Sequence, residues 1–545
     1  MRALRREQIG PVVARPQAIG IDGGKGVKQL TPLVGNPAMV APQRLVLKAG
    51  VEGLQRRLFV GRVQARQPSL RGAQRGGERR ARVGRVGNRC GGYATEQHRQ
   101  PKLRDDFCAM LMYHSRFLFE LGSLISAGGD DAMSTDFRGA ESTARPARES
   151  LESRLMRRLL RDLGDPPIEF EFAWSGERVA PPATLPTERV RIEDRGTLFG
   201  ILSDTMVRFG DAYASGRVDV EGDLIKFLEL VFRHADGPDA QGSMAARVAA
   251  WLRRPRRNTL DGSRDNIHRH YDLGNEFYAL WLGETMAYTC AYYPTADATL
   301  EQAQIAKMDH VCRKLRLRAT DSVVEAGCGW GSLALHIAGR YGAKVRAFNI
   351  SKEQIDYARH RARVQGLAGL VEFVEDDYRN ISGRYDVFLS VGMLEHVGPE
   401  NYPQLGALVR RSLPREGRGL IHSIGRNRPG RLDSWAERRI FPGAHPPSIG
   451  EMMQIFETSG LSVLDIENLR LHYALTLRDW LERYEAAIDK VRAMFKDESF
   501  VRMWRLYLCG SIAGFETGSL QLFQVLFTPQ ENNDIPLTRE FMYAK

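Results

Sequence analysis

The alternation of apolar and polar residues first becomes regular at about residue 149. Apolar residues recur at helical spacing in ESLESRLMRRLLRDL (149–163), and they alternate with polar residues in IEFEFAW (168–174) as in a half-buried strand. RVRIED (189–194) shows the same alternation over a shorter stretch. In DLIKFLELVFRHA (223–235), Asp223 is placed to cap a helix with an apolar stripe. We expect a small α+β domain over residues 149–240.

From residue 258 onward, the patterns of strands and helices alternate. Such alternation is typical of a parallel sheet covered by helices on both faces. The expected strands are DSVVEA (321–326), KVRAFNI (344–350), VEFVEDD (371–377), RYDVFLSVG (384–392), GRGLIHSIG (417–425) and LQLFQVLF (520–527), and the expected helices include SLALHIAGRYG (332–342) and SKEQIDYARHRARVQG (351–366). The fold expected over residues 258–535 is α/β, a doubly wound Rossmann-like sheet.

Residues 1–132 lack both kinds of periodicity, as in RGAQRGGERRARVGRVGNR (71–89). Such a segment buries too little apolar surface to offset the entropy lost on ordering, so we expect a disordered extension. It carries about 23 Lys and Arg against about 10 Asp and Glu, which accounts for the whole net charge of +12. One interpretation is an arm that binds RNA or anionic lipid. The favoured one is an upstream extension that the natural protein lacks, with Met133 as its start.

The cysteine content and the lengths of the apolar runs indicate the cellular compartment and the kind of membrane contact. The six cysteines among 545 residues are scattered, without the paired spacings of a zinc site or a disulfide framework, which favours a reducing cytosol. No run of about 18 apolar residues occurs, so we expect membrane contact to be peripheral, at the inner face of the cell membrane. MAARVAAWLRRPRRN (244–258) has an apolar face and a basic end. It is either a helix that lies on an anionic bilayer or a linker helix with solvated arginines.

A glycine-rich turn marks a candidate cofactor site. Gly327, Gly329 and Gly331 follow an apolar strand and open a helix, where absent side chains let the backbone approach a ligand. Such a pattern alone is often only a tight turn. Glu325, two residues before the first glycine, can attract a cationic ligand, and no phosphate-binding lysine of the P-loop type follows.

This turn resembles that of class I S-adenosylmethionine-dependent methyltransferases. The second strand ends at Asn349, where methyltransferases in general often have an acid, and this departure favours a narrower family. The whole set of motifs resembles cyclopropane fatty acid synthases and mycolic acid cyclopropane synthases. The segments that carry this resemblance, in the family's order, are NIHRHYDLGNEFY (266–278), AYTCAYY (287–293), AGCGWGSLALHIA (326–338), SVGMLEHVG (390–398), LIHSIG (420–425) and LRLHYALTLRDWLERY (469–484).

The resemblance implies a transfer of a methylene group from S-adenosylmethionine to the double bond of an unsaturated phospholipid acyl chain, with bicarbonate as a bound base. The implied cofactor-binding residues are Tyr288, Thr289, Glu325, Gly327, Gly329, Gly331, Asn349, Gln354, Asp377 and Tyr378. The implied catalytic residues, which hold bicarbonate, are Cys290, Glu395, His422, Ile424 through its backbone, and Tyr473. The chemistry suits such a site, because ring closure removes a proton from the former methyl group and water would trap the intermediate carbocation.

Several of these residues also have a purely structural interpretation. Cys290 alone is more often a packed apolar thiol, and Tyr473 a half-buried core aromatic. Glu395 is harder to explain in this way, because it follows a strand at the end where ligands of α/β sheets bind. His422 and Ile424 lie two residues apart on a strand and share a face. The histidines at 268, 270 and 472 lack the partner spacing of a metal site, so we expect no metal.

Three other functions stay open at this point. A lipid methyltransferase that makes a methyl- or methylene-branched acyl chain would use the same cofactor. A non-catalytic lipid-binding protein would need a degenerate cofactor site, and the intact glycines and Glu395 argue against this. A nucleic-acid methyltransferase rests on the basic extension alone, and we expect no nucleic-acid partner. A homodimer is compatible with the sequence.

Overall fold

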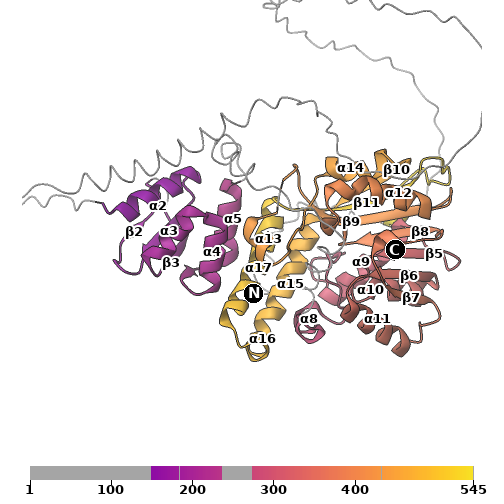
Figure 1. Ribbon diagram of the computed structural model, residues 1–545, viewed down its shortest axis with the longest axis horizontal. Coiled ribbons are helices and arrows are strands. Elements are labelled where there is room, and N and C mark those ends of the chain that lie inside the picture. The colour runs from indigo at the N-terminus through magenta and orange to yellow at the C-terminus, as the bar shows by residue number, and fades with distance from the viewer. Residues whose placement is uncertain (1–148, 183–184, 236–272, 431, 544–545) are drawn as a thin grey trace, which may run out of the picture. The chain divides into compact units, whose positions relative to one another are not determined.

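The computed structural model describes residues 149–182, 185–235, 273–430 and 432–543 (Figure 1). Three expectations from the sequence fall outside these residues. They are the disordered extension over 1–132, the basic segment at 244–258, and the beginning of the motif at 266–278 with His268 and His270.

Residues 149–235 form a four-stranded sheet with helices. The elements in chain order are α2 (Leu151–Asp162), β1 (Ile168–Phe172), β2 (Arg178–Val179), β3 (Glu188–Ile192), α3 (Arg195–Ser203), α4 (Thr205–Ala214), β4 (Val218–Glu221) and α5 (Leu224–Ala235). The sheet order is β2-β1-β3-β4, and only β1 and β3 pair in parallel. The expected helices and strands are present, and Oδ1 of Asp223 caps α5 by accepting a hydrogen bond from the Ile225 N–H at 2.9 Å.

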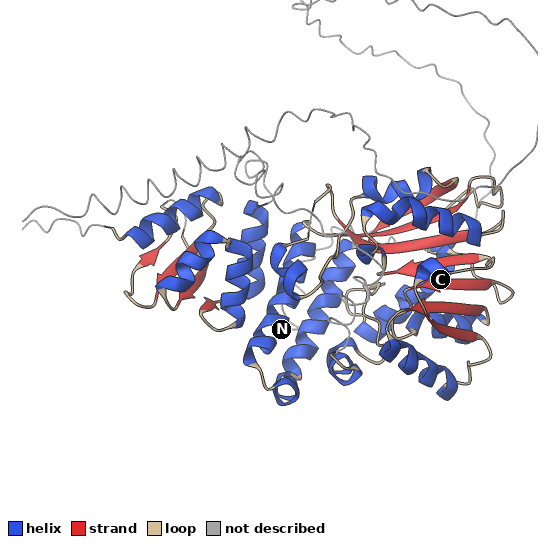
Figure 2. Cartoon of the chain, viewed as in Figure 1, coloured by secondary structure: helices blue, strands red, loops and turns tan. Residues whose placement is uncertain are grey.

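Residues 273–543 contain a seven-stranded, mostly parallel sheet, which confirms the α/β class (Figure 2). Its strands are β5 (Ser322–Ala326), β6 (Lys344–Asn349), β7 (Val371–Glu375), β8 (Val387–Val391), β9 (Arg418–Gly425), β10 (Leu461–Asn468) and β11 (Gln521–Pro529). The order is β10-β11-β9-β8-β5-β6-β7. The strands from β9 to β7 pair in parallel, whereas β11 is antiparallel to both of its neighbours.

Helices cover both faces of this sheet. On one face, α9 (Leu300–Lys314), α10 (Ser332–His336) and α11 (Lys352–Val364) pack on residues such as Val323 and Leu389. On the other, α12 (Tyr402–Ser412) and α14 (Ile449–Glu457) pack on residues such as Val324 and Phe388. Adjacent strand residues therefore belong to different cores, as the period of two in a strand requires. This explains why the central strands have continuous apolar runs.

The remaining helices complete this part of the chain. They are α8 (Asn275–Leu282), α13 (Ser434–Arg439), α15 (Arg470–Ala486), α16 (Ile488–Phe495) and α17 (Glu498–Thr517), with short 3₁₀ turns at η4 (Tyr378–Asn380), η5 (Leu394–His396), η6 (Pro399–Asn401) and η7 (Glu540–Met542). Within the described ranges, none of the helices is both long and apolar enough to cross a bilayer.

Two details differ from the sequence-based expectation. The segment 332–342 is not one α-helix, because α10 ends at His336 and the chain continues as a π-helical turn, η3 (Ile337–Tyr341). The sheet is also not wholly parallel. The strand β10 was not expected, because at the sheet edge most of its residues are only half-buried and its sequence LSVLDIEN lacks clear alternation. β11 inserts between β9 and β10, a placement set by long-range pairing.

Candidate functional site

The glycine turn after β5 places three left-handed backbone positions in a row. Gly327, Gly329 and Gly331 have φ of +84°, +53° and +80°, values that L residues with a side chain rarely adopt. A Cβ at Gly331 would lie 2.6 Å from the Phe373 ring, whereas a Cβ at Gly329 would meet nothing within 4 Å. Packing therefore explains the absence of a side chain at Gly331, and the open space at Gly329 suits a ligand.

Glu325 and Lys307 form a buried pair of opposite charges beside this turn. Burial raises the pKa of Glu325 to about 7, although the Lys307 ammonium opposes this, and burial lowers the pKa of Lys307 to about 8. Oε2 of Glu325 has no hydrogen-bond partner among the described residues. Lys307, on α9, donates from Nζ to Oγ1 of Thr289 at 3.0 Å. The carboxylate is thus available to a cationic ligand.

Asn349, Gln354 and Asp377, which the resemblance implies to bind the cofactor, are only partly brought together. Nδ2 of Asn349, at the end of β6, donates to Oε1 of Gln354 at 2.7 Å and to the Gly329 carbonyl at 3.3 Å. Asp377 instead uses its carboxylate within its own turn, because Oδ1 accepts from the Arg379 N–H at 2.9 Å and Oδ2 pairs with Nη1 of Arg379 at 3.1 Å. The structure brings Asn349, Gln354 and Gly329 together, and the contact of Asp377 with Arg379 was not predicted.

The segment 287–291 is fixed by α9 and by aromatic side chains. Nε2 of Gln304 donates to the Thr289 carbonyl at 2.9 Å. The hydroxyl groups of Tyr288 and Tyr507 lie 2.7 Å apart. Burial raises the pKa of the Cys290 thiol far above its usual range, so this sulfur stays protonated and is not a nucleophile. The rings that surround Tyr288 belong to Tyr278, Trp281 and Trp480.

Glu395 lies in η5, just beyond the carboxyl end of β8. Its Oε1 accepts a hydrogen bond from the Ile424 N–H at 2.6 Å, whereas Oε2 is buried without a partner among the described residues. Burial raises the pKa of Glu395 to about 7, and the hydrogen bonds from the Ile424 backbone and the Ser423 side chain counter only part of this. A carboxyl group of this kind can accept or release a proton near neutral pH.

His422 on β9 is a neutral imidazole. Burial lowers its pKa to about 3, with further lowering by the ammonium groups of Lys307 and Lys314. Its Nδ1 lies 3.1 Å from Nε2 of Gln524 on β11, and its Nε2 is buried without a partner among the described residues. A buried nitrogen without a partner is costly. It therefore points to a ligand, as does Oε2 of Glu395.

Tyr473 and Cys290 both contact the carbonyl oxygen of Leu469. The Tyr473 N–H donates to the Leu469 carbonyl oxygen at 3.3 Å, and Sγ of Cys290 lies 4.0 Å from the same oxygen. The Tyr473 ring is buried, with its centroid 4.6 Å from that of Phe515. Four of the five predicted catalytic residues thus fall into two contacts, Glu395 with Ile424 and Cys290 with Tyr473 through Leu469, whereas the His422 side chain contacts Gln524.

Sequence reasoning missed Lys307, Gln304, Gln524 and Tyr507. The only local signal was in α9, where Lys307, His310 and Lys314 follow one another at helical spacing and are all buried. A lysine within a buried stripe requires a partner. Gln524 and Tyr507 gave no signal, because only the sheet register and helix packing bring them to the site. Within the described ranges, no group of three or more His, Cys, Asp or Glu residues could hold a metal ion.

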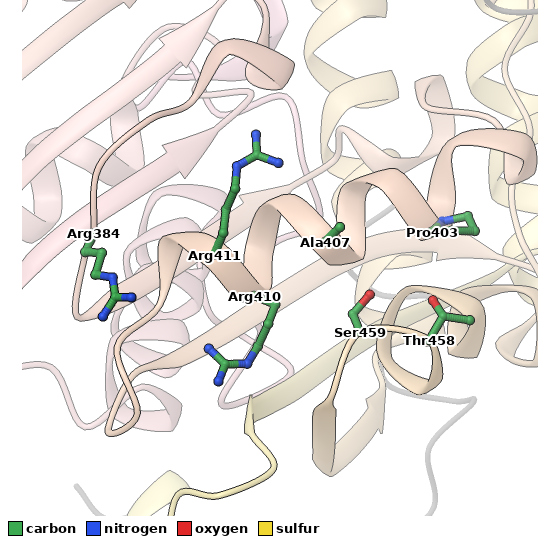
Figure 3. A pocket seen from close by; sticks show the side chains of 7 residues that line it. All are labelled: Arg384, Pro403, Ala407, Arg410, Arg411, Thr458 and Ser459. Carbon is green, nitrogen blue, oxygen red and sulfur yellow. The ribbon is translucent and has the colours of Figure 1, made fainter. Parts of the chain in front are cut away.

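The hollow drawn in Figure 3 is separate from these residues. It has a volume of about 460 Å³ and is lined by Arg384, Pro403, Ala407, Arg410, Arg411, Thr458 and Ser459. Arg384 precedes β8 and Arg411 precedes β9, so the hollow lies at the amino ends of these strands, whereas Glu395 follows the carboxyl end of β8. The Arg411 side chain also points away from Arg384 and Arg410 (Figure 3).

Known proteins that are similar to this chain include cyclopropane synthases and a fatty acid methyltransferase. The sequence model of the family described as "Mycolic acid cyclopropane synthetase" matches residues 258–525. A "Probable fatty acid methyltransferase" of Pseudomonas putida is 38% identical over 62% of this chain and 87% of its own length. The "Cyclopropane-fatty-acyl-phospholipid synthase" of Escherichia coli (strain K12) is 38% identical over 50% of this chain and 69% of its own. "Cyclopropane mycolic acid synthase 1" of Mycobacterium tuberculosis is 31% identical over 49% of this chain and 96% of its own.

Among solved structures, a coclaurine N-methyltransferase bound to N-methylheliamine and SAH matches with a TM-score of 0.51 and 22% identity. The match covers 59% of this chain and 99% of that one, and at this identity it supports the fold alone.

Proposed function

Because this chain belongs to the family of cyclopropane fatty acid synthases and mycolic acid cyclopropane synthases, we propose that it converts the double bond of an unsaturated phospholipid acyl chain into a cyclopropane ring, with S-adenosylmethionine as the donor. Members of this family are S-adenosylmethionine-dependent lipid methyltransferases. The observation that supports ring formation is a pair of buried polar atoms without hydrogen-bond partners among the described residues, Oε2 of Glu395 and Nε2 of His422.

The glycine turn fits S-adenosylmethionine. The open space at Gly329 admits a ligand close to the backbone, and the carboxylate of Glu325 attracts a cation. Asn349 and Gln354 meet beside the same turn. When bound, S-adenosylmethionine supplies an activated methyl group. The chain's part is to orient it and to keep water away.

Exclusion of water follows from the aromatic side chains around Tyr288. Trp281 and Trp480 are fully buried and contact the Tyr288 ring, with centroids 5.3 and 5.4 Å away. An alkene is a weak nucleophile, and a carbocation left by its methylation would be trapped by any nearby water. The apolar wall favours ring closure over that side reaction.

We call Glu395 and His422, with the residues that surround their unpartnered atoms, the base site. It fits a small anion that also carries a hydroxyl group, such as bicarbonate. Oε2 of Glu395 can accept a hydrogen bond and Nε2 of His422 can donate one. Cys290, the Ile424 backbone and Tyr473 are the further residues that we propose to hold it. When bound, bicarbonate supplies a base that removes a proton from the former methyl group. Exhaustive removal of carbon dioxide should slow turnover, and added bicarbonate should restore it.

We further propose that the enzyme meets its substrate at the surface of a bilayer, on the cytoplasmic side. Support comes from the lipid substrate and from the basic segment 244–258 of the sequence. Co-sedimentation with vesicles that contain anionic phospholipids tests this, and binding should weaken as salt is raised. Binding that does not change with salt would show that the basic segment does not contribute to membrane binding.

The lipid product shows whether the enzyme makes a ring or a saturated branch. Mass spectrometry of lipids from a host that expresses the protein measures the mass added to the acyl chain. A ring adds a CH₂ unit to the acyl chain and consumes no reductant. A saturated methyl branch adds CH₂ and two hydrogens, and it needs a reductase. This second candidate has the support of the Pseudomonas putida relative, whose name is that of a fatty acid methyltransferase. A saturated branched product would refute the ring proposal while leaving the family assignment intact.

A further inference from the structure

A row of polar side chains, two of them buried and one half-buried, crosses three strands beside Glu395 and His422. His422 on β9 pairs in register with Gln524 on β11, which pairs with Glu467 on β10. Paired residues of adjacent strands project from the same face of a sheet, and this row faces α9. Nε2 of His310 and Nζ of Lys314, both on α9, lie 2.7 and 2.5 Å from Oε2 of Glu467.

The contact between Gln524 and His422 determines which imidazole nitrogen carries the proton. In the orientation that the Gln524 amide has in the structure, its Nε2 lies 3.1 Å from Nδ1 of His422. An amide nitrogen only donates, so this orientation makes Nδ1 the acceptor, whereas the reversed amide would make it the donor. A neutral imidazole has one N–H group, which must then be on Nε2. Both side chains are buried, so water does not compete for this hydrogen bond.

We propose that Gln524 is a positioning residue that holds His422 in the tautomer with its proton on Nε2, so that this nitrogen donates to the anion in the base site. The inference deepens the proposed function, since it takes the anion site as given. The opposite tautomer would present a lone pair to the anion. An imidazole held by Gln524 avoids that repulsion without the cost of a charged histidine.

The charges around His422 keep it neutral throughout the working pH range. From α9, Lys307, His310 and Lys314 all lower the pKa of His422, in addition to its burial. From β10, Glu467 raises it. Burial favours the protonated form of Glu467, yet His310 and Lys314 bring its pKa down to about 2, so its negative charge persists and offsets part of the Lys314 charge. His422 should therefore stay neutral between about pH 6 and 9.

The tautomer can be measured directly by ¹⁵N NMR of the full chain labelled with ¹⁵N-histidine. Signals of His422 are assigned by difference against His422→Asn. The wild type should show protonated Nε2 and unprotonated Nδ1. Gln524→Glu, studied at alkaline pH, should move the proton to Nδ1, because a carboxylate only accepts. Gln524→Met, which keeps the length but removes the amide, should give a mixture of tautomers.

Kinetics supply the second readout. Both Gln524 variants should raise the KM for bicarbonate by about tenfold or more, as expected for a misdirected hydrogen bond to a charged group, while the affinity for S-adenosylmethionine stays within about twofold of wild type. Thr528→Val is the matched control, because it removes a buried hydrogen bond to the Gly417 carbonyl elsewhere on β11. It should lower the melting temperature without changing the tautomer or the KM for bicarbonate.

A wild type with protonated Nδ1 overturns the inference, whatever happens to activity, and so does a tautomer that Gln524→Glu leaves unchanged. An unaltered KM for bicarbonate in both variants also overturns it. If bicarbonate has no effect on the wild type, the proposed bicarbonate site fails, and the tautomer measurement still decides whether Gln524 sets the tautomer of His422. The wild-type spectrum keeps the test valid even if a variant does not fold.

Discussion

The Ile424 N–H donates a hydrogen bond to Oε1 of Glu395 at 2.6 Å, and Oε2 of the same carboxylate has no partner among the described residues. One strand thus orients a buried acid that follows the neighbouring strand. Because Ile424 acts through its backbone, its side chain can vary without loss of the contact.

Glu395→Gln should lower kcat by about 10²–10⁴-fold, the range that acid–base catalysis contributes, because Glu395 helps to hold the bicarbonate base. It should leave the affinity for S-adenosylmethionine nearly unchanged. The reason is that Glu395 lies outside the glycine turn. Single-turnover kinetics and calorimetry measure the two quantities. Glu416→Gln, at an exposed carboxylate, is the matched control and should match wild type. Normal turnover in Glu395→Gln would remove this residue from the mechanism.

The same substitution should stabilise the protein at pH 8. Burial raises the folded-state pKa of Glu395 from 4.5 to about 7, so the folded state binds the proton more tightly and stability falls as pH rises between these values. Glutamine cannot ionise, and the gain should be on the order of 3 kcal/mol at pH 8. Below pH 4.5 the difference should vanish. Urea unfolding at both pH values tests this, and an equal effect at both would contradict the buried-charge explanation.

Affinity for S-adenosylmethionine should rise with pH up to about 7. The ionised form of Glu325 attracts the cation, and its pKa in the free protein is about 7 because of burial. Below that value, affinity should fall by up to tenfold per pH unit. Titrations between pH 5.5 and 7.5 keep Lys307 mostly protonated, because its pKa is about 8. Glu325→Gln should bind weakly and without this pH dependence, and a persisting slope would assign it to another group.

Two glycines of the turn should respond differently to alanine. Gly329→Ala has space for its methyl group, so it should cost only about 1–2 kcal/mol of stability for the left-handed backbone, yet weaken cofactor binding at least about tenfold. Gly331→Ala should lose about 1–3 kcal/mol more, because its Cβ would lie 2.6 Å from the Phe373 ring. Melting temperature and calorimetric affinity separate the two effects. Normal cofactor affinity in Gly329→Ala would show that the ligand does not use this space.

A chain that begins at Met133 should keep the specific activity and melting temperature of the full chain. The first 132 residues carry a biased composition and none of the six motifs. The two proteins are compared side by side with the same lipid substrate. A severe loss of activity or stability on truncation would show that the extension contributes to the enzyme.

The sequence by itself determined the elements whose causes are local. Alternation along 168–172 and continuous apolar runs along 322–326 and 387–391 predicted strands that the structure contains. The cap at Asp223 and the glycine turn at 327–331 were likewise readable, because each depends on residues within one turn of chain. The placement of Glu395 after β8 followed from the same local patterns.

Only the tertiary structure decided what depends on register and burial. The insertion of β11 between β9 and β10 brings Gln524 to His422, 102 residues earlier in the chain. The packing of α9 places Lys307 beside Glu325, and burial of both shifts their pKa values toward neutrality. No local sequence pattern predicts these pKa values, because the pKa of the Glu325 carboxylate is 4.5 in water and about 7 when the fold buries it. The sequence therefore determines which groups the site contains, and the fold determines their protonation and their partners.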